Sequence, residues 1–420
     1  MVRAGRQQAL NLRPLSSVAL SFAGDAALAG GLYTQQMRQH VQVLIIGAGA
    51  AGSAAAYALA RRGLNVRLLE QFQLGHTRGS SFGPSRIFRL AYEEPDYAGL
   101  ARAALASWRA LEREAEQQLY WRTGGLDLGP AGTPSLEAVH TSLTAIDAAP
   151  ERLSRRELAR RYPQWRVPAD WEAVYSPEAG IVSPDVTLRV LTDLARHHGA
   201  QVLEGVAALE IEPGRQPAVL TGAGTLTCDH LIVAAGAWMP RLVPQLRTSL
   251  SVTLAASSFY RPDDLAAFQP ERFPVFITHD EFQAYGFPVF GLPGVKLGVD
   301  VVRPITSGDD RSFEVPAQVG EASDTFMRRH LPGALTVMER STCLITRAPG
   351  GDFILAAHPD CPQITLASPC SGHGFKFTPL LGELLAAHAL GEGHSWQLPR
   401  FGLPAQAVDT AQGGPAAAGA

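Results

Sequence analysis

The sequence predicts an α/β (α+β) fold in which a parallel sheet is joined to a second, largely antiparallel sheet. Three observations support this. An apolar run at 41–46 leads through glycines into an alanine-rich helix. The apolar run at 231–235 is typical of a fully buried parallel strand, and 65–69 is expected as the strand that follows the helix. From 251 to 302, strand-like runs separated by Gly, Pro and Asp favour an antiparallel sheet.

The composition is that of a globular protein. The chain has 420 residues, of which 46% are hydrophobic and 18% charged, and its net charge is −3. This charge gives no reason to expect a nucleic-acid partner. Four cysteines without a C-x-x-C pair argue against a disulfide scaffold, a zinc site or a redox dithiol. We therefore expect a cytoplasmic monomer with no metal and no membrane partner.

Both ends of the chain differ from the rest. The apolar stretch at 15–32 is interrupted by Asp25 and is a poor membrane span, and a signal peptide is the weaker alternative. Met37 lies four residues before the first predicted strand. We expect residues 1–40 to be a disordered extension. The alternative is that the start is misplaced and the protein begins at Met37, so that residues 1–36 do not belong to it. We also expect the Ala/Gly/Pro-rich tail 403–420 to be disordered.

A glycine motif follows the first strand. Gly47 permits a tight turn, Gly49 lets the backbone approach a pyrophosphate, and Gly52 lets the helix pack against the strand. Glu70 follows Gly52 by eighteen residues, at the end of the next strand, where a carboxylate accepts hydrogen bonds from ribose hydroxyls. Strand, glycines, helix, strand and acid in this order predict a Rossmann-type dinucleotide site.

The helix after these glycines begins with Ala50 and Ala51, whose free amides would face the phosphates. The motif alone does not separate FAD from NAD. A second buried strand ends in a small-residue turn, Gly236-Ala237-Trp238, far downstream. Such a turn is typical of flavoproteins that hold FAD within one folded unit, and an ordinary core strand is the alternative. We therefore predict FAD, with Gly236 and Trp238 beside it.

Further helices and strands follow from periodicity. Amphipathic helices are expected at 98–119 and 188–198. Another helix is expected at 379–390, with Thr378 as its N-cap. Strands are expected at 201–203, 273–277, 284–290, 295–302, 353–356 and 364–367.

Four segments together resemble the monomeric sarcosine oxidase family, which includes N-methyltryptophan oxidase and pipecolate oxidase and belongs to the D-amino-acid-oxidase-like group. They are the glycine motif, 79–89, Tyr285 to Gly298, and Cys343 to Phe377. The last is the most specific, because the spacing from Cys343 to Lys376 also fits the family. The resemblance extends from about Val41 to Leu398.

The resemblance implies two domains and a reaction. The FAD-binding domain would be discontinuous, at 41–120, 175–245 and 335–400, and the catalytic domain would comprise 121–174 and 246–334. The reaction implied is oxidation of the C–N bond of a small N-methyl, cyclic or otherwise substituted amino acid to an imine by hydride transfer to flavin. O₂ would reoxidise the flavin and give hydrogen peroxide.

The resemblance also implies roles for single residues. Cys343 matches the cysteine that attaches flavin covalently, and a buried free cysteine is its alternative. Arg89 and Lys376 match a clamp for the substrate carboxylate. Arg86 matches an arginine near the flavin ring, and Lys296 matches a lysine that activates oxygen. For these cations the alternative is an exposed surface position.

Several other residues lie in the matching segments. His373 is placed near the flavin or the substrate, and a structural histidine is an equal alternative. Tyr285 lies beside the expected pocket, where it would orient substrate or simply pack. The remaining expected flavin contacts are Ser80, Ser85, Gly372, Gly374 and Phe375.

The sequence departs from the family within the pocket. Phe82 and Asp300 stand where sarcosine oxidases carry histidines, and Ile345 replaces a tyrosine. Ser368-Pro369-Cys370 replaces a turn of small residues. Sarcosine itself is therefore not the expected substrate. Asp300 suggests a substrate with a second cationic group, and with Ile345 it completes the predicted substrate-binding set.

Two other functions remain open from the sequence. One is an FAD-dependent dehydrogenase that passes electrons to a protein or quinone, as a subunit of a complex. The other is a flavoprotein that has lost catalysis and serves in binding or assembly. Lys296 favours the oxidase over the dehydrogenase. Retention of Arg89, Lys376 and Cys343 argues against the non-catalytic function.

Overall fold

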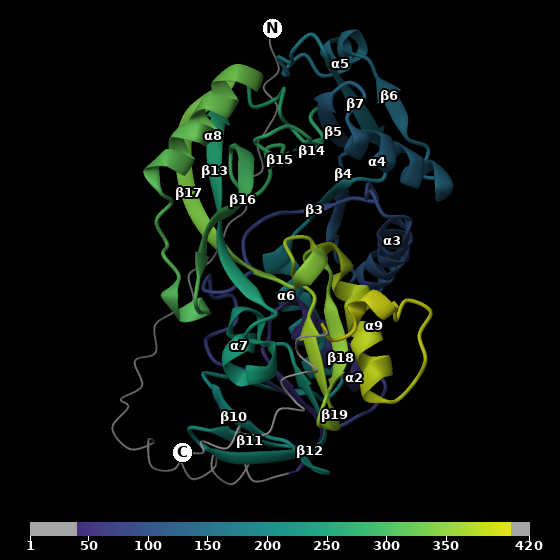
Figure 1. Cartoon of the computed structure of the whole chain (residues 1–420), viewed down its shortest axis with the longest axis vertical. Coiled ribbons are helices and arrows are strands. Elements are labelled where there is room, and N and C mark those ends of the chain that lie inside the picture. Colours follow the sequence, from purple (N-terminus) through teal and green to yellow (C-terminus); the bar gives the residue numbers. More distant parts are fainter. Residues whose placement is uncertain (1–39, 405–420) are drawn as a thin grey trace, which may run out of the picture.

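The computed structural model describes residues 40–404, apart from the side chains of residues 300–302. The expected extension at 1–36 and most of the expected tail lie outside the described residues, as does the side chain of Asp300. Figure 1 shows two sheets one above the other, with the labelled helices at their sides.

The lower sheet in Figure 1 is the dinucleotide-type sheet, in which β12, β1, β2 and β9 are neighbours in that order and run parallel, with β9 at the edge. Another strand, β19, pairs in parallel with β12 and carries β18 at its far side. The eight strands are β1 (Val41–Ile46), β2 (Val66–Glu70), β9 (Gln201–Glu204), β10 (Ala208–Glu212), β11 (Ala218–Thr221), β12 (Gly224–Val233), β18 (Ile354–His358) and β19 (Cys361–Ser368).

Both faces of this sheet are covered. Val43 and Ile45 of β1 belong to a core shared with α2 (Ala50–Ala60), α3 (Pro95–Ala115), α6 (Pro184–His197) and α9 (Thr378–Ala389). Leu44 and Ile46 belong to a second core, with α7 (Met239–Leu242). Successive residues of a strand point to opposite faces, so the continuous apolar run of β1 reflects burial on both sides.

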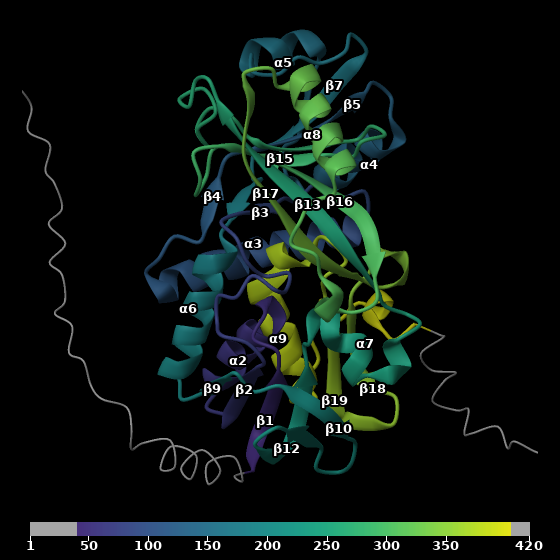
Figure 2. The same cartoon turned by 90° about the vertical axis from the view of Figure 1, so that its left-hand side faces the viewer.

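The second sheet has the order β17-β13-β16-β15-β14-β5-β7-β6. Its helices α4 (Pro134–Ala145), α5 (Arg155–Arg161) and α8 (Ala317–His330) lie at the upper end of Figures 1 and 2. Its strands are β5 (Gly125–Pro130), β6 (Glu151–Leu153), β7 (Trp171–Ser176), β13 (Ser251–Pro262), β14 (Val275–Thr278), β15 (Tyr285–Phe287), β16 (Val295–Ile305) and β17 (Ala334–Arg347). A small sheet of β3 (Arg86–Phe88), β8 (Gly180–Val182) and β4 (Tyr120–Arg122) completes the fold.

The predicted fold class is confirmed: one sheet is parallel at its centre and the other is largely antiparallel. One pair in the second sheet, β14 with β5, is parallel. The helix predicted at 98–119 begins three residues earlier and ends at Ala115. Thr378 was wrongly predicted as an N-cap, because Phe377 has that position and the Thr378 hydroxyl donates to the Phe375 carbonyl 2.6 Å away.

The division into two domains remains a prediction. Its segments can be compared with the two sheets. The strands at 125–130, 171–176 and 251–305 lie in the second sheet. Strand β17 also pairs with β13 there, although the division assigns residues from 335 onward to the nucleotide-binding domain. A strand assigned to one domain therefore hydrogen-bonds in the sheet of the other.

Candidate active site

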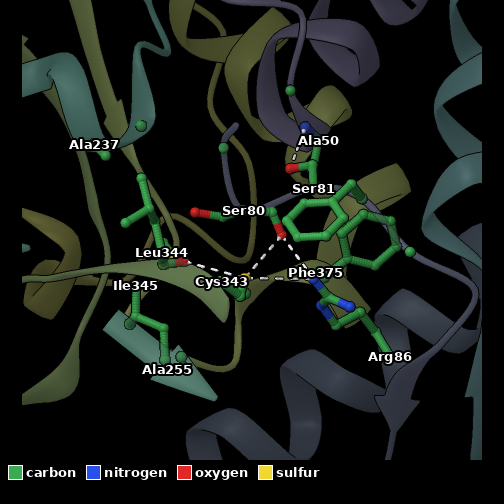
Figure 3. A pocket seen from close by; sticks show the side chains of 18 of the residues that line it. Ala50, Ser80, Ser81, Arg86, Ala237, Ala255, Cys343, Leu344, Ile345 and Phe375 are labelled. Atoms are coloured by element: carbon green, nitrogen blue, oxygen red, sulfur yellow. Dashed lines mark hydrogen bonds between the residues drawn. The ribbon is translucent and has the colours of Figure 1, made fainter. Parts of the chain in front are cut away.

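A cavity of about 1570 Å³ is lined by residues of both sheets. Its walls include the glycine loop after β1, the end of β2, the segment 79–86, and parts of β13, β16 and β17. Figure 3 shows a part of this cavity around Cys343. Most of the predicted site residues line it: Gly47, Gly49, Ala50, Ala51, Glu70, Ser80, Arg86, Arg89, Gly236, Trp238, Tyr285, Lys296, Cys343, Ile345, Gly372, His373, Gly374, Phe375 and Lys376.

The glycine loop has the close packing that its motif predicts. Gly47 has φ +97°, in the region that favours glycine. A Cβ at Gly52 would lie 1.9 Å from the Gly47 carbonyl oxygen, so α2 can approach β1 only through a glycine. Gly52 itself does not line the cavity and acts through this packing. Helix α2 has no side-chain cap, and its Ala50 amide donates to the Ser81 hydroxyl at 3.2 Å.

Glu70 lies at the end of β2 and is 5% exposed. Its Oε2 accepts from the Ala48 amide at 2.9 Å, and its Oε1 accepts from the Phe72 amide at 3.0 Å. The ring Nε2 of His76 also lies 3.4 Å from Oε1. A carboxylate has about four acceptor positions, so one, on Oε2, remains for a ribose hydroxyl. The backbone bonds hold this acid beside the glycine loop.

The residues present fit FAD. The cavity is larger than the roughly 300–1,000 Å³ of drug-sized sites, as a dinucleotide requires. Three features lie along it: a helix N-terminus whose N-cap is Gly49, a close contact that only glycine permits at position 52, and the buried carboxylate of Glu70. Gly236, with φ +51°, and Trp238 lie on the same cavity.

Cys343 lies on β17 and faces the segment 79–86 (Figure 3). Its Sγ is 3.6 Å from Nη2 of Arg86 and 3.9 Å from the Ser80 carbonyl oxygen. The same Nη2 donates to that carbonyl at 2.9 Å. Ser85 is buried behind the wall, and its carbonyl accepts from Nη1 of Arg86 at 2.9 Å. The Arg86 guanidinium is thereby fixed beside the sulfur of Cys343.

Lys296 lies on β16 and is 6% exposed. Its ammonium group is 3.4 Å from the Ser85 carbonyl oxygen, and it lies over the rings of Phe259 and Phe287. Burial, together with the positive charge of Arg86, lowers the pKa of Lys296 to about 7. The predicted alternative, an exposed strand lysine, is not what the structure shows.

Arg89 and Lys376 meet at Tyr92. The Arg89 guanidinium lies over the Tyr92 ring, 4.9 Å from its centre. The Lys376 ammonium, which is 5% exposed as a residue, donates to the Tyr92 hydroxyl at 2.8 Å and to the His373 carbonyl at 3.1 Å. Arg89 also donates to the Ala91 carbonyl. Two cations separated along the chain by 287 positions therefore line one part of the cavity.

His373 uses both ring nitrogens. Its Nε2 lies 2.9 Å from the Gly351 carbonyl oxygen, and its Nδ1 lies 2.9 Å from the Tyr92 hydroxyl. Since a carbonyl only accepts, Nε2 carries the proton and Nδ1 accepts from Tyr92. Burial and the charge of Lys376 lower the pKa of His373 to about 3, so the ring is neutral at pH 7. This geometry favours the structural alternative for His373.

Other predicted residues have simpler surroundings. Ile345, on β17, is buried at the cavity wall (Figure 3). The ring of Tyr285 lies against Gly298, where a Cβ would be 2.2 Å from the tyrosine ring. Gly374 is at a tight turn, because a Cβ there would lie 1.6 Å from the Pro369 carbonyl oxygen. Gly372 has φ +86°, again in the glycine region.

Among the cavity residues that the sequence analysis missed are Ser81, Tyr92, Ser135 and His279. It also missed Asp127, which contacts His279 from behind the wall. Tyr92 follows the matched segment by three residues and carried no signal of its own. Asp127 and His279 are 152 positions apart, and no spacing in the sequence joins them. Of these residues, only Ser81 lies within the matched segment 79–89, so only Ser81 could have been predicted from it.

Within the described ranges, 40–404 less three side chains, no group of His, Cys, Asp or Glu could hold a metal ion. None of the described helices has both the length and the apolar character needed to span a bilayer.

Residues 42–388 match a family described as FAD dependent oxidoreductase. The monomeric sarcosine oxidase of Bacillus sp. (strain B-0618) is 32% identical over 368 residues, covering 84% of this chain and 93% of that protein. The peroxisomal sarcosine oxidase of Mus musculus is 32% identical over 376 residues, covering 85% and 94%. The N-methyl-L-tryptophan oxidase of Yersinia pestis (strain Pestoides F) is 29% identical over 368 residues, covering 86% and 98%.

A solved structure agrees with these similarities. The open form of NikD, an unusual amino acid oxidase essential for nikkomycin biosynthesis, superposes with a TM-score of 0.78. It is 25% identical, and the match covers 87% of this chain and 97% of that chain. The family resemblance predicted from the four sequence segments is confirmed.

Proposed function

Since this chain belongs to the FAD dependent oxidoreductase family, we propose that it oxidises the C–N bond of a small, N-substituted or cyclic amino acid to an imine. One observation carries the proposal: Arg89 and Lys376 meet at Tyr92 on the same cavity as the glycine loop. The dinucleotide and the substrate carboxylate would then bind in one cavity. Sarcosine and N-methyltryptophan oxidases among the relatives support this substrate class.

The cofactor would be held by both sheets. The glycine loop, the amides of Ala50 and Ala51, and Glu70 would bind its phosphates and ribose. Arg86 and Cys343, which is on β17, would lie next to the flavin ring. When bound, FAD supplies a hydride acceptor, and the chain contributes binding, orientation and electrostatics.

The substrate carboxylate would be held by the Arg89–Lys376 pair. Arginine donates in a planar fork that suits a carboxylate, and lysine adds a compact charge. Both contacts of Arg89 with its described neighbours Ala91 and Asp127 use Nη1, so the rest of the guanidinium can donate to a ligand. Holding the carboxylate fixes the position of the adjacent C–N bond. Ile345 and Tyr285 would shape the wall around the remaining substrate.

Lys296 supports O₂ as the electron acceptor. Its buried ammonium lies among aromatic rings, where a positive charge stabilises developing negative charge on oxygen more than it would in water. The product would be hydrogen peroxide. A flavin dehydrogenase that uses a protein or quinone acceptor is the second candidate.

Cys343 would attach the flavin covalently. Its sulfur lines the cavity and lies 3.6 Å from Nη2 of Arg86, which places it beside the space where the flavin would lie. Cysteines elsewhere are sparse, which supports a reducing compartment, the cytoplasm. We expect the protein to be a monomer, which size-exclusion chromatography would test.

A peroxide-coupled screen of the purified holoenzyme tests the function. The panel would contain N-methyl, cyclic, D- and L-amino acids. If the protein is an oxidase, the peroxide formed should be proportional to the substrate consumed. Bleaching of the flavin under anaerobic conditions without peroxide in air would identify the dehydrogenase instead. No bleaching by any amine or amino acid would contradict both.

A further inference from the structure

A chain of polar contacts leads away from Arg89. Its Nη1 lies 3.5 Å from Oδ1 of Asp127, and the same oxygen lies 2.9 Å from Nε2 of His279. The other ring nitrogen, Nδ1, lies 2.9 Å from the Ser135 hydroxyl. The four residues come from the segment after β3, from β5, from the end of β14 and from the first turn of α4. Three of them, Arg89, His279 and Ser135, line the cavity.

Asp127 is the buried member of this chain. It is 4% exposed and lies behind the cavity wall, where it contacts both Arg89 and His279. An ionised carboxylate buried beside a guanidinium is held by that charge. Asp127 is therefore a positioning residue, because it fixes two cavity-lining groups relative to each other. Ser135 is fixed in turn by His279.

The contacts leave an acceptor at Ser135. The ionised carboxylate of Asp127 can only accept, so Nε2 of His279 donates to it. Nδ1 of His279 and the Ser135 hydroxyl form a hydrogen bond at 2.9 Å, and in either direction of that bond the Ser135 oxygen keeps at least one lone pair. That lone pair remains for a ligand. At this point the wall accepts hydrogen bonds.

Two acidic residues, Asp280 and Glu281, follow His279 and also line the cavity. The Asp280 carboxylate accepts from the Thr278 hydroxyl at 2.7 Å and from the Gln283 amide at 3.1 Å, which fixes it in the turn after β14. Carboxylates that line the same cavity as the Ser135 hydroxyl attract a cation more than a neutral donor.

We propose that Ser135, His279 and the Asp280–Glu281 turn form a distal subsite that binds a second, protonated amino group of the substrate. The carboxylate of that substrate would lie on Arg89 and Lys376, at the other end of the same contact chain. The substrate class is then an amino acid with a distal ammonium. This inference rests on the proposed function for the clamp, and it uses residues other than Asp300.

Ligand binding tests the subsite without turnover. The holoenzyme is titrated with ω-amino carboxylates of increasing length and with carboxylates that carry a methyl group in place of the ammonium. Binding is followed by the change in flavin absorbance. At the best length, we expect the ammonium ligand to bind about 10- to 100-fold more tightly, the range for a hydrogen bond to a charged group. Equal affinities for the two ligands at every length would overturn the proposal.

Variants assign the preference to Ser135. Ser135→Ala should remove most of it, and Ser135→Thr, which keeps the hydroxyl, should retain it. Thr141→Ala changes an exposed residue of α4 outside the cavity and serves as the control. An unchanged preference in Ser135→Ala would also overturn the proposal. If the preference is found but no amine bleaches the flavin, the proposed oxidation fails and the subsite stands.

Discussion

The Lys376 ammonium group lies 2.8 Å from the Tyr92 hydroxyl, to which it donates a hydrogen bond. The Tyr92 hydroxyl in turn donates a hydrogen bond to Nδ1 of His373, 2.9 Å away. Burial raises the pKa of Tyr92 well above its usual range, so the hydroxyl remains protonated. A lysine, a tyrosine and a histidine are thereby fixed in one orientation, and the proposed carboxylate clamp depends on it.

Tyr92→Phe should weaken this clamp. It removes the acceptor of Lys376 and leaves the buried Nδ1 of His373 without its donor, which costs about 1–3 kcal/mol. We expect KM for amino-acid substrates to rise about tenfold, with a lower Tm. Steady-state kinetics and thermal denaturation measure both effects. Tyr162→Phe, outside the cavity, is the control, and an unchanged KM in Tyr92→Phe would contradict the assignment.

Arg89→Met and Lys376→Met should each lower kcat/KM about 10- to 100-fold, because each removes a charge-assisted hydrogen bond to the carboxylate. The loss should be small for an amine that lacks a carboxylate. Arg109→Met removes an exposed arginine paired with Glu178 and is the matched control. Equal losses for substrates with and without the carboxylate would argue against the clamp.

Lys296 should make flavin reoxidation depend on pH. Its pKa is lowered to about 7, so the ammonium form dominates below that pH and is lost as the pH rises through it. We expect the rate of reoxidation by O₂, measured by stopped flow, to fall across this range. In Lys296→Met, flavin reoxidation at low pH should be about 100-fold slower than in the unaltered protein. Its rate should also not fall as the pH rises through about 7. Lys296→Arg, which keeps its charge, should react at a rate independent of pH in this range.

Cys343→Ser should release the flavin. After acid precipitation, we expect the yellow colour in the pellet for the unaltered chain and in the supernatant for the variant. Cys370→Ser, at a cavity-lining cysteine on another segment, should leave the colour in the pellet. Colour in the supernatant for all three proteins would show that the flavin is not covalently bound.

Gly52→Ala should disturb the nucleotide site. The added Cβ would lie 1.9 Å from the Gly47 carbonyl oxygen, and such overpacking typically costs about 1–3 kcal/mol. We expect a lower Tm and a lower FAD content per chain, measured by absorbance. Gly393→Ala is the control, because nothing lies within 4 Å of its added Cβ. Full FAD content and an unchanged Tm in Gly52→Ala would contradict the packing argument.

The sequence predicted what is local. Strand, glycines, helix and Glu70 lie within thirty residues, and each has a steric or hydrogen-bonding reason to be there. Asp127 was missed for an equally physical reason. It alternates with Leu126 and Leu128, a pattern that normally places the polar residue toward water. In the fold it is 4% exposed, because His279 and Arg89 cover it from distant segments.

Thr378 was wrongly predicted as an N-cap because its hydroxyl makes a different local hydrogen bond. Threonine before proline at a helix start suits an N-cap, yet the preceding 3₁₀ turn Gly374–Phe377 offers the Phe375 carbonyl to the same hydroxyl. That turn exists because Gly374 packs against the Pro369 carbonyl. A spacing rule cannot include a contact that tertiary structure creates.

The position of Cys343 on β17 has a kinetic consequence. That strand belongs to the second sheet, whereas the glycine loop belongs to the first. If the flavin is bonded to Cys343, rebinding of its nucleotide end to the glycine loop becomes intramolecular, at an effective concentration of order millimolar. Transient opening of the loop would then not release the cofactor, and flavin retention would be independent of its concentration in solution.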